Sequence, residues 1–205
     1  MADYLAILPE IGLVVLAAVI LLVDLILSEK RKDILPWLTF LGFVVIFMLT
    51  VLFSLPDSPQ MVWGGMLRHD LLAFVFRLVF LFGAGVTALF AIGWEAIGKR
   101  GEFYTLLVIS TLGMTLMGAS ANLVMLFLAI ETASIPLYVM AGMTRDDKST
   151  EAGFKYLLFG AMTSSVMLYG FSLLYGFAGT ADIYELAGQI AAGGVPLVTL
   201  TASLL

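Results

Sequence analysis

The chain has 205 residues, of which 61% are hydrophobic and 12% are charged, a balance that indicates an integral membrane protein and excludes a water-soluble domain. The formal net charge of -5 comes from acids scattered among loops and helix ends, so it says little about partners; no nucleic acid is expected. The absence of cysteine excludes disulfides and thiolate-held metals, and the single histidine, His69, argues against a histidine-rich metal or haem site. We therefore expect no redox cofactor, no metal and no catalytic residue in this chain.

The apolar segments predict an all-α fold, a polytopic bundle of transmembrane helices with six complete spans and the start of a seventh. The predicted spans are Tyr4–Leu27, Leu35–Leu55, Asp70–Gly93, Phe103–Gly118, Asn122–Ala141 and Ala152–Phe177. The turn at residues 119–121 is so short that the spans on either side of it must be antiparallel neighbours. The segments Asp57–His69 and Thr144–Thr150 are too polar to cross a membrane, and we expect them to be loops.

Two apolar segments follow the sixth span. Thr180–Gly194 has the apolar spacing of a helix, with Thr180 as the expected N-cap, but it is too short to span. We expect it to lie in the membrane interface or to dock on neighbouring helices. Pro196–Leu205 then begins a further apolar run of ten residues, half the length that a bilayer requires. We therefore expect the chain to be truncated inside its seventh helix.

The distribution of basic residues predicts the orientation of the bundle. The basic residues in loops after odd-numbered spans are Lys30, Arg31, Lys32, Lys99, Arg100, Arg145 and Lys148. Loops after even-numbered spans contain only Arg68. Because basic loops stay in the cytoplasm, we expect the N-terminus and the segment Thr180–Gly194 to lie outside.

One ionisable residue, Glu131, lies near the centre of the fifth predicted span. A charge at the middle of a membrane helix costs about 2.5 to 3.5 kcal/mol, so this carboxylate should face protein or water rather than lipid. Ala133 and Ser134 are small enough to allow close approach of another helix, and Pro136 leaves the carbonyl of Thr132 without its helical donor. This combination favours a kink and a hydrated pocket beside a functional acid; the alternative is a structural polar group whose hydrogen bonds are satisfied.

Four further charged residues lie inside or near predicted spans. Arg77 either extends its side chain to the interface or pairs with a buried acid, and Lys155 either extends to the interface or has a function. Glu10 and Asp24 lie close to the ends of the first span, so we expect both to be exposed to lipid headgroups. The sequence by itself leaves the alternatives for Arg77 and Lys155 open.

Three segments resemble a known family. They are LPEIGLVVLAAVILLVDL at the start of the chain, EFYTLLVISTLGMTLMGASANLVMLFLAIETASIPLYVMAG, and EAGFKYLLFGAMTSSVMLYGFSLLYGFAGT. Together they look like subunit N of bacterial NADH-quinone oxidoreductase, the respiratory complex I. The last two segments resemble a larger superfamily of antiporter-like membrane subunits, which includes multisubunit cation/proton antiporters. Residues 1–205 would then form the N-terminal part of a single antiporter-like membrane domain.

The resemblance implies a function in proton translocation. In the family, the glutamate of the fifth helix is essential for the proton pathway and the lysine of the sixth helix belongs to the same network; Glu131 and Lys155 stand at these positions. Moving a positive charge toward or away from a buried carboxylate changes its proton affinity, so that charge movement becomes proton movement. Arg77 is a possible buried charge partner.

The same resemblance implies the setting of this chain. NADH, flavin, iron–sulfur clusters and quinone are expected in other subunits, the partners are other membrane subunits of complex I and the lipid bilayer, and the location is the bacterial inner (plasma) membrane. The chain would then be a proton-translocating subunit of an NADH:quinone oxidoreductase that performs no redox chemistry itself. Two alternatives stay open, a subunit of a cation/proton antiporter and a purely structural membrane module.

Overall fold

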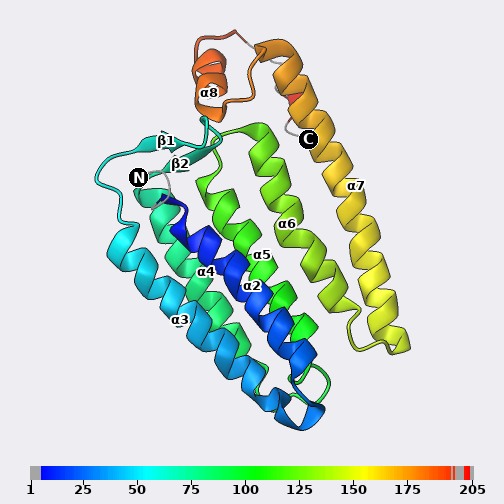
Figure 1. Cartoon of the computed structure of the whole chain (residues 1–205). Helices are drawn as coiled ribbons and strands as arrows, with labels where there is room; N and C mark the ends of the chain where they lie inside the picture. Colours follow the sequence, from blue (N-terminus) through cyan, green and yellow to red (C-terminus); the bar gives the residue numbers. More distant parts are fainter. Residues whose placement is uncertain (1–5, 195, 197–200, 204–205) are drawn as a thin grey trace.

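The computed structural model describes residues 6–194, 196 and 201–203 and shows a bundle of long helices (Figure 1). Six of the described helices are long and apolar enough to cross a membrane. They are α2 (Leu8–Ile26), α3 (Leu35–Phe53), α4 (Leu71–Phe90), α5 (Gly101–Ala119), α6 (Leu123–Ala141) and α7 (Asp147–Ala178). The shorter elements are the 3-10 helix η1 (Glu29–Ile34), the strands β1 (Gln60–Val62) and β2 (Leu67–His69), and the helix α8 (Ile183–Ala191). The predicted polytopic all-α bundle with six spans is therefore confirmed, apart from a two-stranded hairpin.

The starts of the long helices follow from local sequence. Pro9 and Pro36 stand in the first turns of α2 and α3, where the missing N–H has no helical partner to lose. Asp70 caps α4 by accepting a hydrogen bond from the Ala73 amide at 2.9 Å, and Asn122 caps α6 by accepting one from the Val124 amide at 2.9 Å. These residues mark the points where polar connections give way to apolar helices.

The four helices α2, α3, α4 and α5 share one apolar core. Its most deeply buried side chains include Leu13, Phe43, Leu81, Tyr104 and Val108. The helix α6 packs on α5, and α7 packs on α6 at one edge of the bundle (Figure 1). Of the residues of α7, only Gly160, Gly170 and Leu174 are buried, so most of this helix presents apolar side chains outward. The expected antiparallel pairing of the spans that flank residues 119–121 is confirmed, because α5 ends at Ala119, α6 begins at Leu123 and the two helices pack along each other.

At one end of the bundle, which we call the hairpin end, backbone hydrogen bonds join three connections. The strands β1 and β2 form an antiparallel hairpin, in which Val62 pairs with Leu67. The Ala121 amide in the α5–α6 turn donates to the Met66 carbonyl at 2.9 Å, and the Ile183 amide at the start of α8 donates to the Ala121 carbonyl at 2.9 Å. Hairpin, turn and α8 therefore form one continuous cap.

At the opposite end, which we call the basic end, charged groups join the helices. Lys32 forms an ion pair with Asp24 at 3.0 Å, and the guanidinium of Arg100 donates to the Met143 carbonyl. Asp146 caps α7; hydrogen bonds from the Thr144 hydroxyl and then from the Ser149 amide lower the pKa of this carboxyl, which keeps it ionised at the start of the helix. All loops that the basic residues assign to one side thus meet at one end.

Two of the expected loops differ from expectation. The helix α7 begins at Asp147 inside the expected loop Thr144–Thr150, because Asp146 supplies a cap there. The expected loop Asp57–His69 contains the hairpin, whose turn holds Trp63 at φ 54° and Gly64 at φ 65°.

The expected N-cap of the short helix after the sixth span was wrong. Asp182, not Thr180, caps α8, because its carboxylate accepts hydrogen bonds from the amides of Tyr184 and Glu185. Leu186 of α8 packs against Leu123 and Leu174, so the helix docks on its neighbours. Most of the expected seventh span, 196–205, lies outside the described residues. Within that span, the described residues 201–203 are helical.

Thiol labelling tests the predicted orientation. Single cysteines at the exposed positions Ser58, in the connection toward the hairpin, and Lys148, in the first turn of α7, report the hairpin end and the basic end. Because the chain has no other cysteine, a membrane-impermeant maleimide added outside should label Ser58→Cys and spare Lys148→Cys. Labelling after permeabilisation is the control, and the reverse pattern in intact cells would invert the orientation.

The contact of α5 with α6 depends on a glycine. A Cβ atom at Gly113 would lie 2.3 Å from the backbone nitrogen of Ala133, closer than any side chain tolerates. The two helix backbones therefore meet directly at this point, as small residues permit in membrane bundles.

We expect Gly113→Ala to lower the free energy of unfolding by about 1–3 kcal/mol, because the added methyl group must push α6 away. The measurement is thermal unfolding of the purified protein in detergent. Gly83→Ala in α4 is the matched control, since nothing lies within 4 Å of the position of its added Cβ atom. Equal unfolding temperatures for the two variants would contradict the close contact.

Candidate functional site

Glu131 lies in the middle of α6 and is half-buried between its neighbours. Its Oε1 atom accepts a short hydrogen bond from the hydroxyl of Ser164 in α7. No described lysine, arginine or histidine forms an ion pair with this carboxylate. The structure thus gives the acid a neutral partner from another helix, inside the part of the bundle that crosses the membrane.

Small residues bring α7 close enough for this hydrogen bond. A Cβ atom at Gly153 would lie 2.9 Å from the Cα atom of Gly142, and one at Gly160 would lie 2.2 Å from the hydroxyl oxygen of Tyr138. The ring of Tyr138 also meets that of Tyr156 edge to face, with centroids 4.7 Å apart. Ser164 follows Gly160 by about one helical turn, so the packing at Gly160 places its hydroxyl opposite Glu131.

The helix α5 covers the other side of the site. Ser110 donates a hydrogen bond to the Ala133 carbonyl at 2.8 Å, one residue beyond the Thr132 carbonyl that Pro136 deprives of its helical donor. Gly113 packs against the same stretch of backbone. The helix α6 continues through the buried Pro136 as one element. A hydrated pocket beside Glu131 stays a prediction.

Lys155 lies away from Glu131. Its exposed ammonium forms an ion pair with Glu151 one turn earlier in α7. Along α7, Lys155 is about 13 Å from Ser164, at about 1.5 Å per residue, and toward the basic end. The structure therefore keeps the two residues of the expected proton network apart, with Lys155 at the margin of the bundle and Glu131 at its middle.

The structure decides the alternative that the sequence left open for Arg77. Its Nε atom lies 2.8 Å from Oε1 of Glu10, and the exposed fractions of the two side chains are 1% and 7%. The expectation that Glu10 is exposed to headgroups was therefore wrong, because α4 presents a buried cation to the first turn of α2. Asp24, expected at the headgroups too, is largely covered by its ion pair with Lys32.

His69, at the end of β2, extends the Glu10–Arg77 pair toward the hairpin. Its Nδ1 atom lies 3.4 Å from Nη1 of Arg77. Burial and then the neighbouring Arg77 lower the pKa of His69, which keeps the imidazole neutral at pH 7. The second oxygen of Glu10 is buried and receives no hydrogen bond from the described residues. This cluster ties α2 to α4, two helices that pack mainly on α5 and α3.

We expect Glu10→Ala to destabilise the bundle by about 3–5 kcal/mol, because it leaves the Arg77 guanidinium buried without a partner. The double variant Glu10→Ala/Arg77→Met should be more stable than Glu10→Ala, since it removes the orphaned charge as well. Thermal unfolding and yield in detergent measure the effect.

The exposed pair of Lys99 and Asp33 is the control for this experiment. The two side chains are 53% and 68% exposed, so Asp33→Ala should cost less than about 1 kcal/mol. If Glu10→Ala unfolds at the same temperature as Asp33→Ala, the buried pair does not tie α2 to α4.

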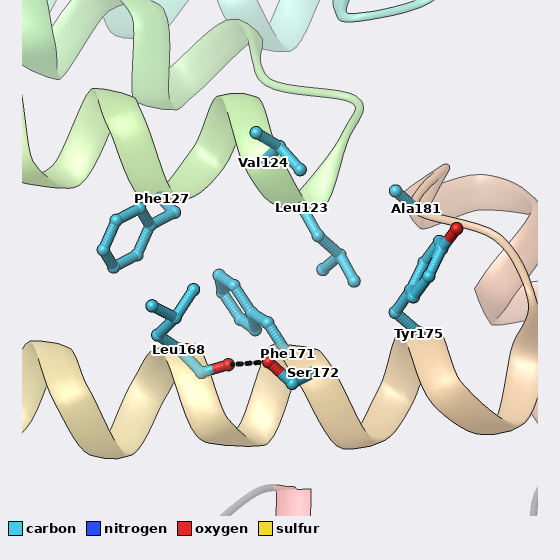
Figure 2. A pocket seen from close by; sticks show the side chains of 8 residues that line it. All are labelled: Leu123, Val124, Phe127, Leu168, Phe171, Ser172, Tyr175 and Ala181. Carbon is cyan, nitrogen blue, oxygen red and sulfur yellow. Dashed lines mark hydrogen bonds between the residues drawn. The ribbon is translucent and has the colours of Figure 1, made fainter.

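An apolar groove of about 490 Å³ runs between α6 and α7 toward the hairpin end (Figure 2). Its walls are Leu123, Val124, Phe127, Leu168, Phe171, Ser172, Tyr175 and Ala181. The hydroxyl of Ser172 donates to the Leu168 carbonyl at 2.8 Å, so it bonds to its own helix. The groove is lined by no carboxylate, amine or imidazole, and its polar side chains are the hydroxyls of Ser172 and Tyr175. Among the described residues there is also no group of three or more metal-ligating side chains of the histidine, cysteine or carboxylate type.

This fold, with an acid in the middle of a membrane helix, defines a class: the antiporter-like membrane domains. Residues 120–205, which include α6, α7 and α8, match the family described as NADH:quinone oxidoreductase/Mrp antiporter, TM. The family relationship that the sequence motifs indicated is therefore confirmed. More narrowly, the chain resembles subunit N of NADH-quinone oxidoreductase.

The subunit N of Desulfovibrio desulfuricans is 36% identical over 194 residues, which cover 93% of this chain and 38% of that protein. The subunit N of Rhodospirillum rubrum is 37% identical over 190 residues, covering 91% of this chain and 39% of the relative. Respiratory complex I from Thermus thermophilus contains a chain that superimposes with a TM-score of 0.70 at 28% identity, covering 96% of this chain and 43% of that one. The chain thus spans about two fifths of the length of these relatives.

Proposed function

We propose that this chain is a membrane subunit of an NADH-quinone oxidoreductase in a bacterial plasma membrane, and that it contributes a proton-translocation half-channel coupled to quinone reduction. The observation that carries the proposal is the carboxylate of Glu131, half-buried in the middle of α6 and hydrogen-bonded across the helix contact to α7. Placing an acid at this depth in a membrane costs free energy, and for this reason acids found there mark functional sites.

The chemistry of this site suits a carrier of protons. An ionised carboxylate only accepts hydrogen bonds, whereas a protonated one also donates, and a serine hydroxyl both donates and accepts. Ser164 is therefore a partner for both states of Glu131 and permits the acid to gain and lose a proton without a change of helix packing.

Lys155 and Glu151 supply a mobile charge in this proposal. Both side chains are more than 60% exposed, and they pair one turn apart near the basic end. When the lysine leaves Glu151 and extends along α7, its positive charge approaches Glu131 and lowers the affinity of that carboxylate for a proton. Water has to bridge the distance that then remains between the ammonium and the carboxylate.

The partners in this proposal are the other membrane subunits of the complex and the lipid bilayer. NADH, flavin, iron–sulfur clusters and quinone belong to other subunits, in agreement with the names of the relatives, which are subunits of a redox enzyme. Within this chain the work is transport, carried out by side chains that take up and release protons.

A second candidate is a subunit of a cation/proton antiporter, because the family that matches residues 120–205 includes Mrp antiporters in its description. The two functions differ in their source of energy. Transport in the first requires NADH oxidation, whereas the second exchanges protons for sodium without any redox reaction. Proton movement in vesicles that responds to NADH and not to a sodium gradient supports the first.

The substitution Glu131→Gln tests the proposal in the full-length protein within its complex. The amide keeps the volume and the hydrogen-bonding capacity of the acid, so assembly should be preserved, while NADH-driven proton pumping should fall by at least about tenfold because the amide does not titrate. Glu131→Asp should be milder, since it keeps the charge and withdraws the carboxylate by one methylene. The measurement is acidification of inverted membrane vesicles, normalised to assembled complex.

Glu185→Gln is the matched control, because it makes the same chemical change at an exposed acid of α8. Its pumping should equal that of the wild type. A Glu131→Gln variant that pumps like this control, or that loses pumping only in proportion to lost assembly, would remove Glu131 from the proton pathway and leave the structural alternative.

A further inference from the structure

Ser164 differs from the serine and threonine residues near it in α7. The hydroxyls of Thr163, Ser165 and Ser172 donate to backbone carbonyls of their own helix, at 2.8 Å from the nearest acceptor in each case. Such bonds satisfy a hydroxyl inside a membrane helix without a partner elsewhere. Only Ser164 of these four turns its hydroxyl to another helix, where it donates to Oε1 of Glu131. The hydrogen bond of Ser164 to Glu131 therefore differs from the bonds that the other three hydroxyls make within α7.

We propose that Ser164 is a positioning residue for Glu131, an inference that rests on the proposed function. The single hydroxyl engages Oε1 and holds the carboxylate in one orientation, so that Oε2 is the atom that gains and loses the proton. The serine itself transfers no proton in this assignment. It sets the direction of the acid by donating to one of its two oxygens.

The charged residues of α5 and α7 lie far along these helices from Glu131. On α5, the charged residue Glu102 lies in the first turn, at the basic end. On α7, the charged residues Asp147, Lys148, Glu151 and Lys155 lie in the first nine positions, at the same end. The nearest charged groups of both helices are therefore several turns below the level of Glu131, and the described hydroxyl of Ser164 is the polar contact of its carboxylate.

Close packing between α6 and α7 at two glycines determines the position of this hydroxyl. The two helices lie side by side along most of their length (Figure 1). Gly160 sits against the Tyr138 ring one turn before Ser164, and Gly153 sits against Gly142 two turns earlier again. Because the two helices approach closely at both glycines, Ser164, one turn after Gly160, lies opposite Glu131.

The test compares three variants of the full-length protein in its assembled complex: Ser164→Ala, Ser164→Thr and Ser165→Ala. Ser164→Ala removes the donor, so NADH-driven proton pumping should fall about tenfold at neutral pH and its pH profile should change, because the carboxylate is no longer held in one orientation. Ser164→Thr keeps the hydroxyl and should restore both the rate and the pH profile to near those of the wild type.

Ser165→Ala is the matched control, because this neighbouring hydroxyl bonds to the Ala161 carbonyl of its own helix. It should pump like the wild type at every pH. If Ser164→Ala has the wild-type pH profile, whether it pumps fully or loses pumping only in proportion to assembly, the serine merely packs and the inference is overturned. Glu131→Gln, measured in the same vesicles, separates this result from a failure of the proposed function. Full pumping by Glu131→Gln would remove Glu131 from the proton pathway. Lost pumping by Glu131→Gln, together with an unaltered pH profile of Ser164→Ala, would reject only the role of Ser164.

Discussion

The bundle depends on one constraint: a polar group that lies within the hydrocarbon layer has to find its partner inside the protein, because no water is there to provide one. The buried threonines of α3 and α5 meet this constraint locally. Thr39, Thr50 and Thr111 each donate to a carbonyl of their own helix at 2.7 to 2.8 Å. Charged side chains have no such local solution, and their partners define the contacts between helices. Arg77 and Glu10 join α4 to α2, and Ser164 and Glu131 join α7 to α6.

These two contacts differ in what they allow. The pair of Glu10 with Arg77 is almost completely buried, so loss of either partner leaves the other buried without its hydrogen bond. Glu131 is half-buried, and its partner among the described residues is the neutral hydroxyl of Ser164. The first contact is suited to holding the hairpin end together. The second is the contact to which we assign proton transfer in the proposed function.

Close helix packing converts these pairwise contacts into a defined site. Gly113 brings the backbone of α5 against α6, and Gly153 and Gly160 bring α7 against the other side. Small residues at such positions allow two helix backbones to approach each other closely. The resulting van der Waals contacts between the helices replace contacts with lipid. Glu131 is therefore held between two helices whose separation is set by glycine, and not by long flexible side chains. The apolar groove further along the same contact has no carboxylate, amine or imidazole in its walls, whose polar side chains are the hydroxyls of Ser172 and Tyr175 (Figure 2).

The sequence by itself determined the membrane class, the six spans, the shared end of the basic loops and the unusual position of Glu131. These features depend on hydropathy, on helix length against bilayer thickness and on charges counted along the chain, all of which are local properties. The partners of the buried charges depended on the tertiary structure, because they join residues far apart in sequence. Nothing near Glu10 indicates that Arg77 neutralises it, and headgroup exposure was the wrong expectation for that reason. In the same way, Ser164 is one of several hydroxyls on α7, and only the packing of Gly160 against Tyr138 decides that this one faces Glu131.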